Sequence, residues 1–376
     1  MTRLGILGGG QLAQMLTQAA ISLGIETAIF ERTPDSPAAR LTQHQVVGAW
    51  DDEAALISFA ALCDVVTLEN EFVDASALRR LEAMGLPVYP SSATLAQVQD
   101  KLIQKETMAA AGLPVPPFRT VDTPDDAHAA GQEFGYPLVL KARRDGYDGY
   151  GNATLRRPLD IAPAWERLSK GGRALYVEAF VPFVRELAVM VVRGQTGVTR
   201  TYPVVETVQQ NHICHVVRAP APISPEIADR AATVARRAVE AVDGVGVFGV
   251  ELFMLNEGRI VYNEIAPRPH NSGHYTIEGC ITSQFENHLR AVLGWPLGKT
   301  DLRVPAAVMV NLLGRHDGAA NPDGIQAALA VASAHIHLYG KRDVRVGRKM
   351  GHVTVLGDTI EKCEILARQA ANLVDL

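Results

Sequence analysis

Residues 248–274 read FGVELFMLNEGRIVYNEIAPRPHNSGH. Two runs rich in Val, Ile, Phe and Tyr, residues 247–255 and 260–265, flank the polar segment 256–259, a pattern typical of an antiparallel hairpin with a short loop. If Leu255 pairs with Ile260, Glu251 lies directly opposite Glu264. Facing residues on such a pair have Cβ atoms roughly 4.5–5.5 Å apart, and like charges there destabilise the sheet.

Two acids held this close favour a cation between them. Magnesium is usually bound through one or two carboxylates together with the phosphates of a substrate. The alternative interpretation is a pair of solvated acids on an exposed sheet face, and the hairpin alone leaves both open. The run Arg-Pro-His-Asn-Ser-Gly-His at residues 268–274 favours the metal site.

Composition bounds the class of protein. At 376 residues the chain is long enough for two or three domains. It has no apolar run of the ~20 residues that a membrane span requires and no signal-peptide pattern at its start, so we expect a cytoplasmic protein without a membrane partner. A net charge of −5 gives no global attraction for nucleic acid. The four scattered cysteines, without C-x-x-C spacing, predict buried thiols rather than a zinc site or disulfides.

The first hundred residues alternate short apolar runs, at 4–7, 26–30, 46–47, 65–68 and 88–89, with helical stretches, which predicts a parallel α/β layer. The turn Gly8-Gly-Gly-Gln-Leu-Ala13 follows the first run, and Glu31 lies 21 residues beyond Gly10. This matches the dinucleotide-binding fingerprint. The same turn also serves any phosphate at a helix N-terminus, or plain tight packing. An NAD-dependent oxidoreductase therefore stays an alternative.

Further units follow along the chain. A helix is predicted at 100–111 and is ended by the Pro-rich segment 112–117. Strands at 137–142, 153–155, 175–181 and 186–192, with a helix at 160–169, predict a small α+β module. Strands at 199–205 and 212–219 and helices at 225–242 and 283–293 surround the hairpin. The segment from 306–313 to a closing helix at 359–373 predicts a β-rich C-terminal unit.

Lys141 ends a predicted strand and is followed by the glycine-rich loop 143–152. Glycines let backbone N–H groups approach phosphate oxygens, and the ammonium adds a point charge, so the pattern predicts a phosphate cradle. A hairpin turn with a surface lysine is the alternative. Glu178 and Glu186 flank an apolar linker that could bind a purine through its backbone and a ribose through a carboxylate.

In order and spacing, these residues resemble the nucleotide and metal residues of the ATP-grasp superfamily. The resemblance rests on Lys101, Lys141, the loop Gly146–Gly151, Glu178 with Val181, Glu186, Glu251, Asn263 and Glu264. Within the superfamily, segments 8–12, 263–274 and 339–352 resemble the 5-(carboxyamino)imidazole ribonucleotide synthase family, over residues 4–357. Tyr150 is a departure, since some relatives carry Arg or Lys there.

The resemblance implies a fold with four parts. These are an N-terminal Rossmann-like pre-ATP-grasp domain at 1–99, a small lid subdomain at 100–182, a large subdomain at 183–300 and a C-terminal β-rich domain at 301–376. The implied class is mixed α/β and α+β. The resemblance also leads us to expect a homodimer.

The implied reaction uses ATP to phosphorylate bicarbonate, and the carboxyphosphate then carboxylates aminoimidazole ribonucleotide. Glu251 and Glu264 would hold Mg²⁺ or Mn²⁺, and Arg268, His270 and Asn271 would form the carboxyphosphate pocket. An imidazole there could transfer protons, because its unperturbed pKa lies near neutrality. The implied ATP contacts are Lys101, Lys141, Gly146, Tyr147, Asp148, Gly149, Tyr150, Gly151, Asn152, Glu178, Ala179, Phe180, Val181, Glu186, Gln209, Asn263 and Glu264.

Five cations lie between residues 341 and 349, and such a cluster favours an anion. The resemblance assigns the ribonucleotide to Gly9, Gln11, Leu12, Tyr147, Asp148, Lys341, Arg348 and Lys349. Glu69 and Glu71 would join the same cleft. Nucleic acid is disfavoured because the cluster lacks an aromatic platform. Other ATP-grasp ligases, of the formate-dependent glycinamide ribonucleotide transformylase or biotin carboxylase type, would share the ATP site but differ in this basic segment.

Overall fold

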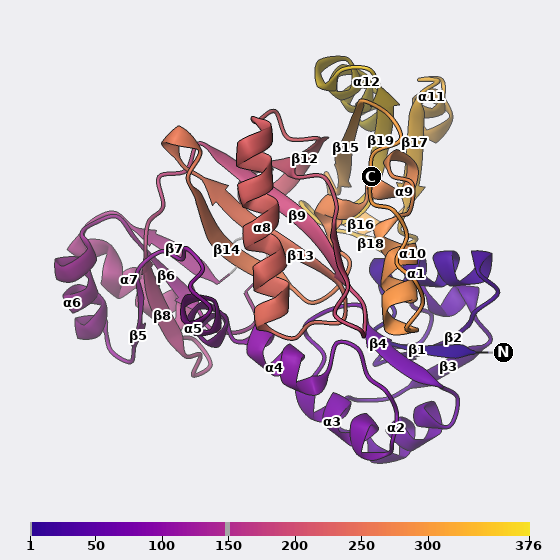
Figure 1. The fold of residues 1–376 in the computed structure, drawn as a ribbon, viewed down its shortest axis with the longest axis horizontal. Coiled ribbons are helices and arrows are strands. Elements are labelled where there is room, and N and C mark those ends of the chain that lie inside the picture. Colours follow the sequence, from indigo (N-terminus) through magenta and orange to yellow (C-terminus); the bar gives the residue numbers. More distant parts are fainter. Residues whose placement is uncertain (1, 147–150) are drawn as a thin grey trace.

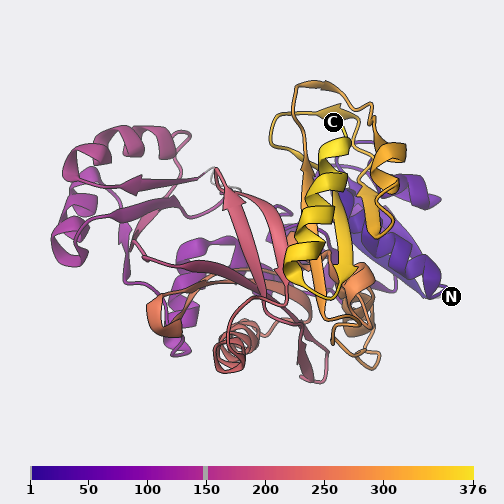
Figure 2. The ribbon, with the colours of Figure 1, turned by 90° about the horizontal axis from the view of Figure 1, so that it is seen from above.

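The structure, a computed structural model, describes residues 2–146 and 151–376. The roles predicted for Tyr147, Asp148, Gly149 and Tyr150 therefore lie outside the described residues. Figure 1 shows a central sheet with the N-terminal part on one side, a small lobe on the other, and the C-terminal helix α12 above. The view from above in Figure 2 places the small lobe at one end of the molecule and both chain termini at the other.

The N-terminal part is a parallel sheet in the order β3-β2-β1-β4. Its apolar strands are buried between helices, as parallel strands require. The strands are β1 (Arg3–Leu7), β2 (Glu26–Glu31), β3 (His44–Val47) and β4 (Val65–Leu68). The helices are α1 (Gln11–Ser22), α2 (Glu53–Ala60), α3 (Ala75–Ala83) and α4 (Ser92–Gln99).

The small lobe is an antiparallel sheet in the order β5-β8-β6-β7, backed by two helices. Its strands are β5 (Phe118–Val121), β6 (Leu138–Ala142), β7 (Asn152–Leu155) and β8 (Leu175–Ala179), and its helices are α6 (Pro124–Phe134) and α7 (Ile161–Leu168). Helix α5 (Lys101–Ala110) leads into it, with Asp100 capping the first turn. The glycine loop lies between β6 and β7 at one edge of this sheet.

The central sheet has nine strands in the order β14-β13-β9-β11-β12-β15-β19-β17, with β10 paired to β9. The strands are β9 (Arg185–Arg193), β10 (Thr199–Thr201), β11 (Val205–Gln210), β12 (Ile213–Ala219), β13 (Gly246–Met254), β14 (Ile260–Ala266), β15 (Ala306–Leu313), β17 (Ala334–Leu338) and β19 (Lys349–Gly357). A separate pair is β16 (Gly318–Ala319) with β18 (Asp343–Val344). Helices α8 (Pro225–Ala241), α9 (Thr276–Gly279), α10 (Gln284–Val292), α11 (Ile325–Leu329) and α12 (Ile360–Leu373) complete this part.

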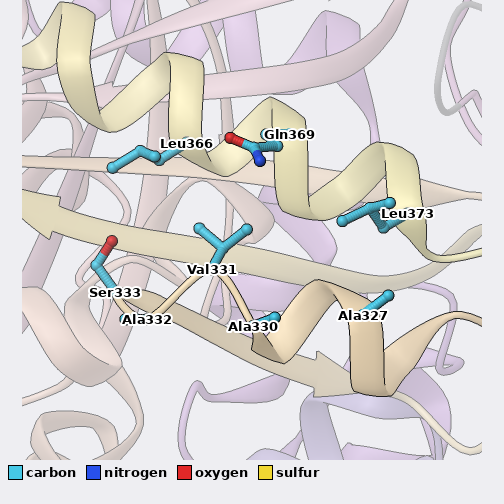
Figure 3. Close-up of a pocket in the computed structure, with 8 residues that line it drawn as sticks. All are labelled: Ala327, Ala330, Val331, Ala332, Ser333, Leu366, Gln369 and Leu373. Carbon is cyan, nitrogen blue, oxygen red and sulfur yellow. The ribbon is translucent and has the colours of Figure 1, made fainter.

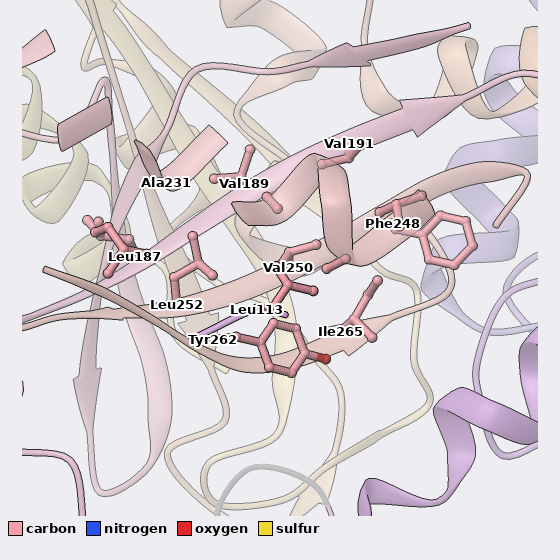
Figure 4. Packing of buried hydrophobic residues seen from close by; sticks show 14 of the residues in the cluster. Leu113, Leu187, Val189, Val191, Ala231, Phe248, Val250, Leu252, Tyr262 and Ile265 are labelled. Carbon is pink, nitrogen blue, oxygen red and sulfur yellow. The ribbon is translucent and has the colours of Figure 1, made fainter. Parts of the chain in front are cut away.

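Helix α8 covers one face of the central sheet at β9, β13 and β14 (Figure 1), and Figure 4 shows the apolar side chains that pack there. The side chains of Leu187, Val189 and Val191 point to this face of β9, while the alternate residues of the strand pack in a second core on the other face. Full burial of one such side chain contributes roughly 1.5–3 kcal/mol. Both faces of β9 are therefore buried, and β9 pairs along its whole length with β13, the hairpin strand that carries Glu251.

The mixed α/β and α+β fold is confirmed, with some differences in the elements. The predicted strand 199–205 is two strands, β10 and β11, and the predicted strand at 88–89 is a single bridge from Val88 to Val66. The predicted boundary at residue 300 does not divide the sheet, because β12 pairs with β15. The four domain ranges themselves stay predictions. Among the described residues, the structure contains no helix long and apolar enough to cross a membrane.

Candidate active site

Glu251 on β13 lies directly opposite Glu264 on β14, as the sequence predicted, but by a different register. The predicted pairing of Leu255 with Ile260 is wrong: Met254 pairs with Ile260, and a β-bulge after Glu251 restores the opposition of the acids. The turn is one residue longer than predicted, and within it Glu257 and Gly258 both adopt positive φ, 61° and 73°.

The bulge also determines which side chains share a face. Tyr262 and Ile265 are both buried in the core, with two residues between them rather than one. Asn263 and Glu264 therefore both turn away from the core, which a regular strand does not allow for consecutive residues. Asn263 Nδ2 lies 3.5 Å from Glu251 Oε2. The three polar side chains thus form one cluster on the hairpin.

Three lysines surround these acids. Lys101, at the start of α5, places Nζ 2.7 Å from Glu264 Oε2. Lys141 on β6 pairs with Glu178 on β8, and Lys105 Nζ lies 3.1 Å from the other oxygen of that carboxylate. Sequence reasoning missed Lys105, although its spacing of four from Lys101 places both on one face of a helix. The Glu178 carboxylate is buried and paired with two ammonium groups, so both of its oxygens are already engaged within the protein.

Glu186 on β9 is the second acid of the predicted purine site. Its carboxylate hydrogen-bonds the side chain of Gln209 on β11. Burial, with the charge of Glu264 adding to it, raises the pKa of Glu186 to about 7. The linker residues Ala179, Phe180 and Val181 connect β8 to β9, and the Phe180 side chain is exposed. Glu186, unlike Glu178, keeps its carboxylate available to a ligand.

The described ends of the glycine loop approach each other closely. A Cβ built on Gly151, whose φ is +129°, would lie 2.8 Å from Gly146 Cα, so a side chain there would open the base of the loop. Asn152 pairs with Lys141 across β6 and β7. Arg143 fixes the entry by a bidentate ion pair with Asp100, with Arg143 Nη2 2.7 Å from Asp100 Oδ2. The loop therefore starts beside Lys101 and ends beside Lys141.

Arg268 and His270 follow the hairpin and line a cavity of about 290 Å³ together with Lys101, Glu264 and Glu71. Glu71 receives both arms of the Arg268 guanidinium, one at 2.8 Å. Burial, with the positive charge of Arg268 adding to it, lowers the pKa of His270 to about 3. The ring thus lies in a buried and cationic place that favours its neutral form, and its role in proton transfer stays a prediction.

Asn271 lies beside this cavity and is held from the C-terminal part of the sheet. Its amide exchanges two hydrogen bonds with Asn311 on β15, at 2.9 and 2.7 Å. Gln284 binds the backbone of His270 from both sides, accepting from its N–H at 2.9 Å and donating to its carbonyl at 2.8 Å. The loop conformation is thus fixed by Gln284 and Asn311, two residues that sequence reasoning missed.

The basic segment approaches the cavity only in part. Lys341 Nζ donates to the Lys349 carbonyl at 2.6 Å and lies 5.6 Å above the Tyr339 ring. The charge of Lys349 is close enough to contribute to the lowered pKa of His270. Arg342 instead forms an exposed ion pair with Asp35 at 2.8 Å. Arg348 Nη1 donates to the carbonyl of Asp343, within its own segment.

The N-terminal glycine turn is filled by the protein itself. Glu69 accepts from the N–H of Gly10 at 3.0 Å and of Ala13 at 3.3 Å, and Glu31 accepts from the N–H of Gly9 at 2.8 Å. These are the donors that a dinucleotide pyrophosphate would need. The geometry therefore disfavours the NAD alternative. Gln11 begins α1 at this turn, whereas the side chain of Leu12 is buried in the N-terminal core, which leaves its backbone for substrate contact.

A larger hollow, of about 560 Å³, lies between α11 and α12 (Figure 3). Its lining is apolar except for Ser333 and Gln369. Phosphates and divalent cations require charged or strongly polar groups. The chemistry of the chain is therefore concentrated at the smaller cavity beside Arg268.

Three protein-family models match successive segments of the chain. A ribonucleotide synthetase preATP-grasp domain matches residues 1–99, an ATP-grasp domain matches residues 106–285, and a phosphoribosylaminoimidazole carboxylase C-terminal domain matches residues 307–365. Together these matches cover most of the chain.

Similar proteins carry consistent names. An N5-carboxyaminoimidazole ribonucleotide synthase of Synechococcus elongatus is 44% identical over 353 residues, which cover 94% of this chain and 89% of that protein. A phosphoribosylaminoimidazole carboxylase of Schizosaccharomyces pombe is 43% identical over 96% of this chain, which spans 66% of that longer protein. A solved N5-carboxyaminoimidazole synthase of Aspergillus clavatus, in complex with ADP and 5-aminoimidazole ribonucleotide, has a TM-score of 0.90 at 39% identity and covers 99% of this chain and 98% of that one.

Proposed function

The chain belongs to the N5-carboxyaminoimidazole ribonucleotide synthase family of ATP-grasp proteins, and we propose that it carboxylates 5-aminoimidazole ribonucleotide at the expense of ATP. It is an ATP-dependent ligase that forms a C–N bond in purine biosynthesis. Bicarbonate is activated as carboxyphosphate, and the products are the carboxyamino ribonucleotide, ADP and phosphate. One observation carries the proposal: Arg268 and the hairpin acid Glu264, which faces Glu251 across the hairpin, line a single cleft with Lys101.

The roles of the residues follow from their charges. Lys101 and Lys141 bind phosphate oxygens of ATP, together with the backbone of the glycine loop. Glu186 accepts hydroxyl hydrogen bonds from the ribose, and residues 179–181 contact the purine. Glu71 binds the Nε and Nη2 arms of Arg268, and the remaining N–H donors of this guanidinium suit an oxygen of bicarbonate or carboxyphosphate. Lys341 and Lys349 bind the ribonucleotide on one side of its site, and the turn at Gly9 and Gln11 forms the opposite wall of that site.

A divalent cation fits the hairpin. Lys101 compensates Glu264, which lowers the pKa of that carboxyl, whereas burial and the charges of Glu264 and Glu186 raise the pKa of Glu251. Among the residues that the structure describes, Glu251 therefore lacks a lysine partner of its own, and a bound cation would stabilise its ionised form. Carboxylates with an amide oxygen from Asn263 are ligands that Mg²⁺ or Mn²⁺ prefers. Such a cation, when bound, would neutralise charge on the transferring phosphoryl group.

The reaction is tested by phosphate release from ATP, with the ribonucleotide and bicarbonate each supplied or omitted. We expect turnover that depends on both. Absence of stimulation by the ribonucleotide would overturn the assignment. Glycinamide ribonucleotide with formate, or biotin with bicarbonate, replaces it in parallel reactions, and stimulation by either favours the corresponding ligase class instead.

The metal site has a separate test that does not depend on turnover. Binding of Mn²⁺ in the presence of a non-hydrolysable ATP analogue is measured by electron paramagnetic resonance. Glu264→Gln should weaken this binding and abolish turnover while the circular dichroism spectrum is unchanged. Glu257→Gln, at the exposed tip of the same hairpin, is the matched control. Undiminished Mn²⁺ binding by Glu264→Gln would refute the ligand role. The proposed homodimer is tested separately by analytical ultracentrifugation.

A further inference from the structure

Three polar side chains form a row across the C-terminal half of the central sheet. Asn311 on β15 pairs in register with His352 on β19, and His352 pairs in register with His337 on β17. Directly paired residues project from the same face of a sheet, so the three side chains lie side by side. Asn311 and His352 are buried. None of the three is among the residues that line the cleft described above.

The segment that follows the carboxyphosphate loop lies on this row. Its contacting residues are Asn271, His274 and Glu278, whose spacing of three and four is that of one helical face. At the first position, Asn271 and Asn311 exchange two amide hydrogen bonds. At the second, the ring of His274 stacks on that of His352, with centroids 4.9 Å apart.

The third contact closes the row at its outer end. His337 Nε2 lies 2.6 Å from Glu278 Oε1, and the rings of His337 and His352 stack with centroids 4.5 Å apart and an angle of 11° between their planes. Each residue of the row therefore receives one residue of the segment 271–278. A shift of the segment along the sheet would break all three contacts together.

His352 also supports the basic segment. Its Nδ1 lies 3.0 Å from the hydroxyl oxygen of Tyr339, and the Tyr339 ring lies beneath the Lys341 ammonium. Lys341 in turn donates to the carbonyl of Lys349, three residues before His352 on the same strand. The His352 imidazole thus makes two connections. It contacts the segment that carries Asn271 by stacking on His274, and it is linked to Lys341 by way of Tyr339.

This polar row stabilises the fold less than apolar side chains in the same place would. Within the described part of the chain, His352 Nε2 is buried without a hydrogen-bond partner. An unsatisfied buried polar atom destabilises a fold, whereas apolar side chains of the same shape would not. The row is therefore better explained by how it positions the segment 271–278 and the basic segment than by any stability that it adds to the fold.

We propose that Asn311 and His352 are positioning residues, which hold the carboxyphosphate loop in register with the ribonucleotide site. The proposal rests on the function proposed above. In the productive step the substrate amine attacks the carboxyl carbon, a C–N bond forms, the bond to the phosphate oxygen breaks, and the amine proton leaves with the phosphate. If the two half-sites are out of register, carboxyphosphate instead decomposes to carbon dioxide and phosphate. The row thus couples ATP consumption to carboxylation.

The test is the stoichiometry of two near-isosteric variants, Asn311→Asp and His352→Phe. Phosphate release is followed by phosphorus NMR, and the carboxylated amine by carbon NMR with isotope-labelled bicarbonate. We expect each variant to release at least about three times more phosphate per carboxylated product than the wild type, with the KM for ATP unchanged, because small misplacements cost far more in rate than in binding. His335→Phe, an exposed position of the same strand as His337, should keep the wild-type ratio.

The outcomes separate the proposals. A wild-type ratio in both folded variants would overturn the positioning role, whatever their melting temperatures. If His352→Phe does not fold, Asn311→Asp alone decides the question. A wild-type protein whose phosphate release ignores the ribonucleotide refutes the proposed function instead, and that result is read before any variant is compared.

Discussion

Lys105 Nζ lies 3.1 Å from Glu178 Oε2, and both side chains are almost completely buried. The other oxygen of Glu178 pairs with Lys141. Burial alone would raise the pKa of Glu178, but the two lysines outweigh it and lower that pKa. Burial lowers the pKa of Lys105 to about 8 even though Glu178 opposes the shift. One buried carboxylate therefore pairs with two lysines next to the proposed phosphate site.

We expect Glu178→Gln to destabilise the protein strongly, because it leaves two buried cations facing each other. Breaking a buried pair by removing one partner costs about 3–5 kcal/mol. Urea unfolding measures the loss. Glu166→Gln, exposed on α7 of the same lobe, should change the free energy of unfolding by less than about 0.5 kcal/mol. Equal stabilities of the two variants would contradict the pairing.

The raised pKa of Glu186 predicts a pH dependence of ATP binding. The carboxyl is protonated below about pH 7 and cannot accept hydrogen bonds from the ribose hydroxyls as a carboxylate. The affinity for ATP should therefore fall as the pH drops through 7, and calorimetric titration across this range measures it. Glu186→Gln should bind ATP weakly with a flatter profile. The ionisation of ATP itself affects both proteins alike, so parallel profiles would refute the role of Glu186.

The hairpin shows what a sequence pattern can and cannot specify. The alternation of apolar residues around a short polar loop predicts the hairpin, but with the observed turn regular pairing would place Asn263 opposite Glu251. A bulge at Asn263 brings Glu264 into that position. No residue type requires the bulge, and only the packing of Tyr262 and Ile265 in the same core reveals it. The prediction was right about the pair and wrong about the register that produces it.

Residues that position other residues also could not be predicted from the sequence. Asn311 lies in an apolar strand, and its partner Asn271 is 40 residues earlier, so only the packing of the segment after β14 on β15 brings them together. At the glycine turn, the sequence left open an NAD alternative that the three-dimensional contacts disfavour. Its spacing fits a dinucleotide, but Glu69 occupies the amides, and no local pattern announces that an acid 59 residues away will fold back onto Gly10.

The close contact between Gly9 and Ser36 predicts a specific defect and its repair. A Cβ built on Gly9 would lie 2.6 Å from Ser36 Cβ, so Gly9→Ala should push away the segment that carries Asp35 and Arg40, which contact the basic segment. We expect the KM for the ribonucleotide to rise about tenfold, with the KM for ATP unchanged. Ser36→Gly in the same chain removes the clashing atoms and should restore it. No recovery in the double variant would refute the steric cause.

An ion network joins the ATP-binding part of the sheet to the C-terminal helix. Arg218 on β12 places Nη1 2.9 Å from Glu206 Oε2 and Nε 2.7 Å from Glu364 Oε2 on α12. The hydrogen bonds from Arg218, followed by those from Arg368, lower the pKa of Glu364. A carboxyl with a lowered folded pKa stabilises the protein above its unfolded pKa of roughly 4.3, and this contribution disappears as the pH falls through the folded value.

Glu364→Gln should therefore lower the free energy of unfolding at pH 7, by about 1–3 kcal/mol as for other hydrogen bonds to charged groups. The difference between wild type and variant should shrink steadily as the pH is lowered below about 4, since both proteins then carry a neutral group at this position. Urea unfolding at a series of pH values gives both quantities. Glu240→Gln on α8, whose carboxylate lies 4.0 Å from Arg236 at the surface, is the matched control and should have little effect at any pH. A Glu364→Gln deficit that stays constant into acid would mean that packing of α12 against β15, rather than the charge of Glu364, holds the helix in place.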